Sequence, residues 1–125
     1  MTGLRLGEGG SIIDISSRDG ILPEGDVLRY KASKAGTILL SKALAIEPEQ
    51  FSIRGNSVCM GFIPMDIHRE ANEPAKRIGG YIRKNQTGGC VTPDEVSCAA
   101  LFLASDEVSF PGGTEIIVDG RICKE

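Results

Sequence analysis

The feature that most constrains the fold is a short β-branched run followed by a long helical pattern. Residues 11–17 read Ser-Ile-Ile-Asp-Ile-Ser-Ser, a composition typical of a strand in a buried parallel sheet. After a loop at 18–26 that contains Gly and Pro, apolar residues recur at helical spacing over 27–46. A second strand pattern covers 51–59. A strand, a helix and a strand in this order predict a parallel sheet with a crossover connection.

The remainder of the chain continues the alternation after a looser segment. Residues 60–90 are punctuated by Pro and Gly and contain two short helical patterns, near 66–72 and 75–85. An insert of this kind within a compact domain often serves as a lid. Thr-Pro-Asp-Glu at 92–95 is a capping box that starts a helix, and residues 114–118 form a third strand pattern. We therefore expect one α/β domain over residues 1–125, in the order β-α-β-insert-α-β.

Two polar residues at the head of the long helix form a candidate acid/base pair. Tyr30 and Lys34 are four residues apart, so a helix places them one turn apart on one face. A phenol releases its proton reluctantly at neutral pH, and a neighbouring ammonium favours the ionised form. Tyr30 is thus a candidate general acid/base, and Ser17, thirteen residues earlier, is a candidate to hold a substrate oxygen. For the bare spacing, an exposed Tyr and Lys on a helix surface is the commoner explanation.

The motifs around this pair change its interpretation. The chain contains, in order, G-G-S-I-I-D-I-S-S, Y-K-A-S-K, I-R-G-N-S-V-C-M-G and G-T-E-I-I-V-D-G. From Gly9 to Gly120 their order and spacing resemble the short-chain dehydrogenase/reductase family, in its C-terminal part. The resemblance implies a partial, three-layer Rossmann-like sheet. It also implies an NAD(P)-dependent oxidoreductase that interconverts a secondary alcohol and a ketone.

The resemblance assigns roles to individual residues. It implies that Tyr30 gives or takes the proton of the alcohol or carbonyl. Lys34 would bind the nicotinamide ribose and favour the phenolate, and Ser17, the second serine of its pair, would steady the substrate oxygen. Contacts to NAD or NADP would fall on Tyr30, Lys34, Gly61 and Ile63. We expect no metal site, because the Cys and His residues lack metal-ligand spacing.

The cofactor end departs from the family pattern. The family's Gly-rich phosphate loop belongs to a part that would precede Met1, so we expect the N-terminal nucleotide-binding half to be absent from this chain. Asp14 stands where the family has Asn, and Met60 replaces a Pro before Gly61. Met65 stands where a Thr helps to hold the nicotinamide carboxamide. Met60, Phe62 and Met65 either line a hydrophobic substrate pocket or fill the core.

Two hypotheses about function follow. The first is the oxidoreductase, with a small-molecule alcohol or ketone as its substrate. The second is a truncated, non-catalytic relative that acts through association, either as a homo-oligomer or with a full-length subunit. The apolar strand at 11–17 would become an exposed sheet edge, which favours pairing. In the family, the helix at 27–46 pairs subunits.

Composition argues against other classes of function. A net charge of -3 without a basic block argues against nucleic-acid and membrane-surface partners. No apolar run approaches the roughly 18 residues of a membrane span, and the N-terminus does not resemble a signal peptide, so we expect a cytoplasmic protein. The four cysteines lack metal-site spacing, and we expect free thiols, with Cys59 and Cys98 in the core.

Overall fold

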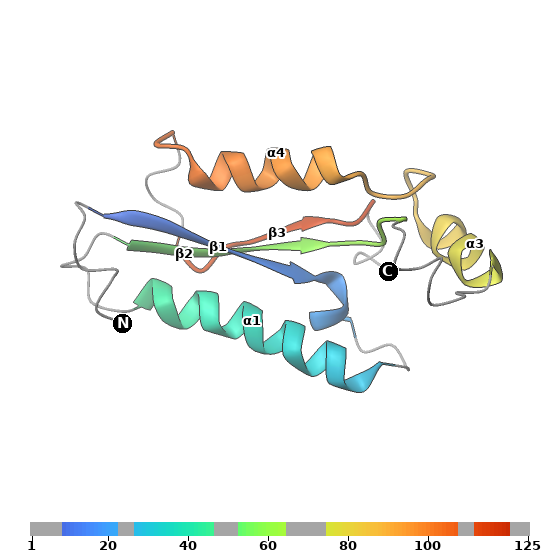
Figure 1. The fold of residues 1–125 in the computed structure, drawn as a ribbon, viewed down its shortest axis with the longest axis horizontal. Coiled ribbons are helices and arrows are strands. Elements are labelled where there is room, and N and C mark those ends of the chain that lie inside the picture. Colours follow the sequence, from blue (N-terminus) through green and yellow to red (C-terminus); the bar gives the residue numbers. More distant parts are fainter. Residues whose placement is uncertain (1–8, 23–26, 47–52, 65–74, 108–111, 121–125) are drawn as a thin grey trace.

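The computed structural model describes residues 9–22, 27–46, 53–64, 75–107 and 112–120 (Figure 1). The elements in chain order are β1 (Gly10–Ser17), the 3-10 turn η2 (Arg18–Gly20), α1 (Leu28–Ile46), β2 (Ile53–Met60), α3 (Ala75–Lys84), α4 (Pro93–Ala104) and β3 (Glu115–Val118). The predicted α/β order is confirmed. The helical pattern near 66–72 lies outside the described residues.

The three strands form one parallel sheet in the order β1-β2-β3. In its register Ile15 lies beside Val58, and Val58 beside Ile116. Helix α1 covers one face of the sheet and α4 covers the other, which gives the three predicted layers (Figure 1). The strands run in the same direction, so their carboxyl ends meet at one end of the molecule, where α3 also lies.

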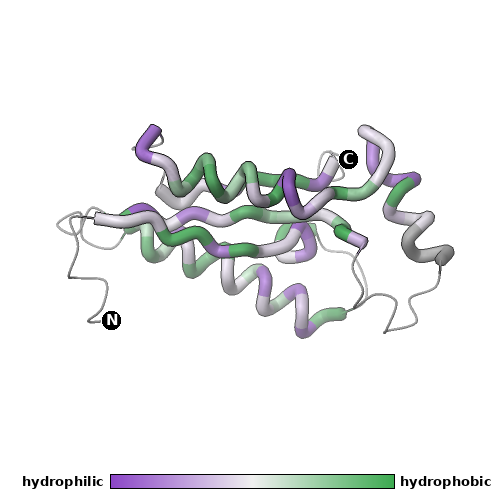
Figure 2. The backbone as a smooth tube through the Cα atoms, turned by 45° about the horizontal axis from the view of Figure 1, so that its top comes forward, coloured by the Kyte–Doolittle hydropathy of each residue, from purple (hydrophilic) through white to green (hydrophobic). Residues whose placement is uncertain are grey.

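The apolar core lies between the sheet and α4. Its buried members are Val58 from β2, Val96 and Leu103 from α4, and Ile63 and Val91 from the connecting segments. Figure 2 shows hydrophobic residues along the strands and α4. The predicted capping box starts α4: Glu95 N–H donates to the Thr92 hydroxyl at 3.3 Å, and Thr92 N–H donates to Glu95 Oε2 at 2.7 Å. These reciprocal bonds satisfy donors that the first helical turn leaves unpaired.

The opposite face packs α1 closely against the strands. A Cβ at Gly55 would lie 2.6 Å from the carbonyl oxygen of Ser41, so this strand glycine permits the helix to approach. The buried Ser41 donates a 2.5 Å hydrogen bond to Asp14 Oδ2, which joins α1 to β1. Lys42 and Glu115 form an ion pair between α1 and β3.

The cysteine predictions are partly wrong. Cys59 in β2 is fully buried, as expected, and burial raises the pKa of its thiol. Cys98, however, is exposed, because the side of α4 that meets the sheet carries Val96 and Leu103 instead. Cys59, Cys90 and Cys98 are free thiols, and Cys123 lies outside the described residues. Within the described ranges, no helix is both long and apolar enough to cross a membrane.

Candidate active site

The candidate residues gather at the carboxyl end of the parallel sheet. Ser17 is the last residue of β1, and Tyr30 and Lys34 occupy the first two turns of α1. Figure 1 shows that the start of α1 lies at the same end of the molecule as the strand ends and α3. Open α/β sheets bind ligands at this end because the loops that leave the strands converge there.

Tyr30 and Lys34 lie side by side, and Lys34 also reaches the sheet. The ammonium nitrogen of Lys34 is 5.7 Å from the centre of the Tyr30 ring. The same nitrogen donates a 2.9 Å hydrogen bond to the carbonyl oxygen of Ile15. Tyr30 is 42% exposed. Lys34 is therefore bound to β1 near the strand's carboxyl end, and the exposed Tyr30 ring lies beside it.

The two neighbouring serines make different contacts. Ser16 is fully buried, and its hydroxyl donates to the carbonyl oxygen of Lys34 at 2.8 Å. The Ser17 hydroxyl accepts the backbone N–H of Asp19 at 3.2 Å and caps the η2 turn. A hydroxyl that accepts in this way retains its proton for donation. Ser16 thus fixes α1 to β1, and Ser17 keeps a donor at the end of the strand.

A glycine that the sequence marked only as a loop breaker sets the distance between η2 and α1. A Cβ at Gly20 would lie 2.8 Å from both the amide nitrogen of Ala35 and the carbonyl carbon of Lys34. Such a separation is shorter than a van der Waals contact, so only glycine fits without a shift. Asp19, in the same turn, lies 3.7 Å from the ammonium of Lys31 on α1.

The two predicted cofactor contacts after β2 are packed into the fold. Gly61 N–H donates to the carbonyl oxygen of Val118 at 2.8 Å, and a Cβ at Gly61 would lie 2.9 Å from Cα of Asp119. The Ile63 side chain belongs to the buried core beside Val91. Any contact of Ile63 with a cofactor would therefore have to involve its backbone. The assignment of both residues stays a prediction.

The question whether Met60, Phe62 and Met65 line a pocket or fill the core has a different answer for each residue. Met60 packs against the buried core, whereas the Phe62 ring stacks on Tyr81 of α3 with centroids 4.8 Å apart and planes at 3°. Met65 lies outside the described residues. Arg18 lies over the other partner of this stack, with its guanidinium carbon 5.0 Å from the centre of the Tyr81 ring. Arg18 and Tyr81 were not among the predicted site residues, because no local pattern links two residues so far apart in the chain.

Comparisons with known proteins agree with this arrangement. A family model described as enoyl-(acyl carrier protein) reductase matches residues 3–120. A short-chain type dehydrogenase/reductase from Mycobacterium marinum shares the fold with a TM-score of 0.82 and 32% sequence identity, over 94% of this chain and 46% of that one. This chain belongs to the short-chain dehydrogenase/reductase family. The Rossmann-like fold expected from the resemblance is confirmed.

Two further members illustrate the range of this family. The chain is 35% identical to cyclopentanol dehydrogenase from Comamonas testosteroni over 117 residues, which are 94% of this chain and 47% of the relative. A candidate 2-deoxy-d-gluconate 3-dehydrogenase from Agrobacterium tumefaciens with bound NADP has a TM-score of 0.88 and 25% identity, over 98% of this chain and 50% of that one. The chain spans about half the length of the curated relatives it matches. The expected absence of a nucleotide-binding half stays a prediction.

Proposed function

We propose that this short-chain dehydrogenase/reductase chain provides the acid/base side of an NAD(P)-dependent oxidoreductase that interconverts a secondary alcohol and a ketone. The observation that carries the proposal is the position of Lys34, which contacts the end of β1 and lies beside the exposed Tyr30 ring. The cyclopentanol dehydrogenase relative acts on a secondary alcohol by its name, and this supports the proposed substrate class. We place the reaction in the cytoplasm.

Tyr30 is assigned the proton transfer because it is exposed and lies beside Lys34. In ketone reduction the Tyr30 hydroxyl donates its proton to the carbonyl oxygen, and in alcohol oxidation the phenolate accepts the alcohol proton. The Lys34 ammonium lies beside the ring that carries this hydroxyl, 5.7 Å from its centre. Ser17 donates a hydrogen bond to the substrate oxygen and so orients it toward Tyr30.

The described residues fit the nicotinamide end of a dinucleotide in their donor set. An ammonium group has three N–H donors, and the Ile15 carbonyl uses one of those on Lys34. The remaining donors can bind ribose hydroxyls beside Tyr30. When bound, the nicotinamide would supply or accept the hydride. The Agrobacterium tumefaciens neighbour that binds NADP supports a dinucleotide as the cofactor.

Replacing the Tyr30 hydroxyl tests the proposal. Cyclopentanone reduction is followed by the loss of NADH or NADPH absorbance in the parent, in Tyr30→Phe and in Thr37→Val, which removes a hydroxyl further along α1. Loss of the acid/base group should lower turnover about 100- to 10,000-fold, while the melting temperature stays at the parent value. Thr37→Val should retain activity. Equal turnover in Tyr30→Phe and the parent would refute the acid/base role.

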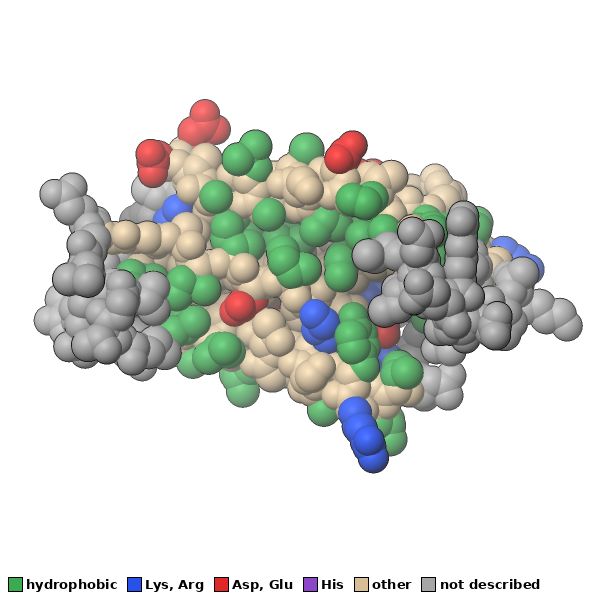
Figure 3. Space-filling view, in the orientation of Figure 1, with side chains coloured by type: hydrophobic (Ala, Val, Ile, Leu, Met, Phe, Trp, Pro, Cys, Tyr) green, Lys and Arg blue, Asp and Glu red, His purple; other side chains and the backbone are tan. Residues whose placement is uncertain are grey.

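A second candidate function, subunit association, rests on exposed apolar side chains. In the single chain Leu28, Leu39 and Ile46 of α1 are 75%, 68% and 83% exposed. Figure 3 shows hydrophobic side chains gathered over the sheet between α4 and α1. Within the described sheet, β1 has a neighbouring strand on one side only. An apolar helix face and a free strand edge are the surfaces that associating proteins bury.

Dinucleotide titration separates the two candidate functions. Saturable binding of NADH or NADPH that raises the melting temperature would favour the oxidoreductase. A folded protein that binds neither dinucleotide, but sediments as an oligomer, would favour association. A monomer that binds dinucleotide would exclude association as the main role.

A further inference from the structure

We infer that Tyr81 is a positioning residue, which couples helix α3 to the turn that carries Ser17 through the guanidinium group of Arg18. This inference rests on the role proposed for Ser17. It assigns a task to three side chains that the acid/base chemistry does not use: Arg18, Phe62 and Tyr81. We call these three side chains the aromatic stack.

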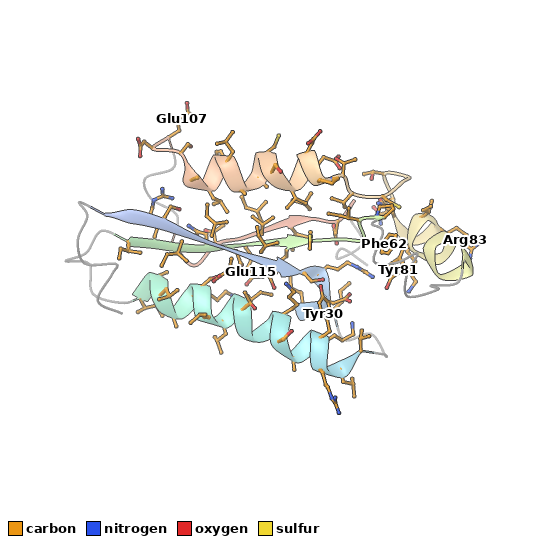
Figure 4. The ribbon with its side chains drawn as sticks, in the orientation of Figure 1. Tyr30, Phe62, Tyr81, Arg83, Glu107 and Glu115 are labelled. Atoms are coloured by element: carbon orange, nitrogen blue, oxygen red, sulfur yellow. The ribbon has the colours of Figure 1, made fainter. Side chains whose placement is uncertain are left out.

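The aromatic stack joins segments that are distant in sequence. Tyr81 lies in the middle, with the Phe62 ring parallel to it at 4.8 Å and the Arg18 guanidinium carbon at 5.0 Å. Figure 4 shows Phe62 and Tyr81 together between α3 and the strand ends, at the same end of the molecule as Tyr30. Arg18 is only 2% exposed, so its cation–π contact with Tyr81 is made largely out of water, where such a contact is strongest.

Arg18 is connected to Ser17 through the backbone and the hydrogen bonds of the η2 turn. Arg18 directly follows Ser17 and begins η2. Its carbonyl oxygen accepts the backbone N–H groups of Ile21 and Leu22, both at 2.9 Å, while the Ser17 hydroxyl caps the same turn through Asp19. A displacement of the Arg18 side chain therefore acts on a turn whose geometry orients the Ser17 hydroxyl.

The α3 end of the stack is held at the carboxyl ends of all three strands. Phe62 follows β2, and Arg18 follows β1. Asn85, directly after α3, lies against Gly120 beyond β3, where a Cβ would collide with the Asn85 side chain. The Asn85 amide also donates to the carbonyl oxygen of Gly89 at 2.8 Å. Helix α3 is thus fixed relative to the strand ends, and Tyr81 provides its contact with the turn beside Ser17.

Hydrogen exchange tests the coupling independently of activity. Tyr81→Leu removes the ring but retains apolar volume, and it should accelerate exchange of the Ile21 and Leu22 amides about tenfold. Tyr81→Phe keeps the ring and should restore the parent rates. The matched control Ile82→Ala changes a neighbouring, exposed α3 residue and should leave the Ile21 and Leu22 amides at the parent rates.

A variant at the other end of the contact, Arg18→Met, shows whether the effect of Tyr81→Leu is coupling or only a local defect in α3. Coupling between two sites acts equally in both directions, so Arg18→Met should accelerate exchange in α3, including the Asn85 amide that bonds to the Tyr81 carbonyl. If Tyr81→Leu or Arg18→Met changes exchange only in its own segment, the coupling is refuted.

Kinetics distinguish a positioning role from a purely structural one. Because Ser17 is assigned to orient the substrate oxygen, Tyr81→Leu should lower kcat about tenfold, while dinucleotide affinity stays at the parent value and Tyr81→Phe restores kcat. Exchange coupling with an unchanged kcat would overturn the positioning role. A parent protein without turnover would instead refute the proposed function, and the exchange measurements would still decide whether α3 and the Ser17 turn are coupled.

Discussion

Gly20→Ala should weaken both the fold and the candidate active site, because Gly20 lies where η2 meets the backbone of α1. The new Cβ would lie 2.8 Å from the Ala35 amide nitrogen and from the Lys34 carbonyl carbon. Both atoms belong to a helix backbone and cannot rotate away. The turn or the helix must therefore move by about 0.6 Å to restore an ordinary van der Waals separation.

The size of the effect follows from this forced movement. Overpacking of this kind costs about 1–3 kcal/mol in the free energy of unfolding. For a chain of this length, 1 kcal/mol corresponds to about 4 °C in melting temperature, so the expected decrease is about 4–12 °C. The same movement displaces Lys34 from the Ile15 carbonyl oxygen, and a shift of this size should lower kcat/KM about tenfold.

A second glycine in α1 provides the matched control. A Cβ at Gly36 would meet no atom within 4 Å, so Gly36→Ala adds a methyl group without a clash. Since alanine favours a helix over glycine, this variant should stabilise the protein by about 1 kcal/mol. Thermal and urea denaturation of the parent and both variants measure the difference. A Gly20→Ala protein as stable as the parent would refute the steric argument.

Two further predictions concern single ionisable groups. Cys59 should resist N-ethylmaleimide at neutral pH, because burial raises the pKa of its thiol, whereas the exposed Cys98 should react quickly. Mass spectrometry after brief labelling measures both, and equal labelling would contradict the buried position of Cys59. Hydrogen bonds from the Thr92 backbone and hydroxyl hold the pKa of Glu95 below its usual value of 4.5. This stabilisation is present above that pH and is lost as the pH falls through the lower, folded value. Melting curves between about pH 2 and 7 should therefore lose less stability on acidification in Glu95→Gln than in the parent, and identical profiles would contradict the capping role.

The sequence determined the order of the strands and helices and the spacing of the candidate active-site residues along the chain. Strands and helices leave local periodic patterns, and the capping box at Thr92 is readable from four consecutive residues. The spacing of Ser17, Tyr30 and Lys34 can also be read from the sequence. Ser17 ends a strand, and Tyr30 and Lys34 lie in the first turns of the next helix, so this spacing places all three at the carboxyl end of the sheet. Their chemical roles stay predictions until turnover is measured.

Only the tertiary structure decided how these elements meet. The Arg18 and Tyr81 side chains contact each other across segments that carry no shared pattern, so their stack depends on where α3 packs. Gly20 has the same sequence character as any loop glycine, yet the approach of α1 leaves no room for a Cβ there. Cys98 is apolar and helical but exposed, because which side of a helix meets a sheet depends on the packing of the whole layer. Periodicity is local in sequence, whereas these contacts arise from packing between distant segments.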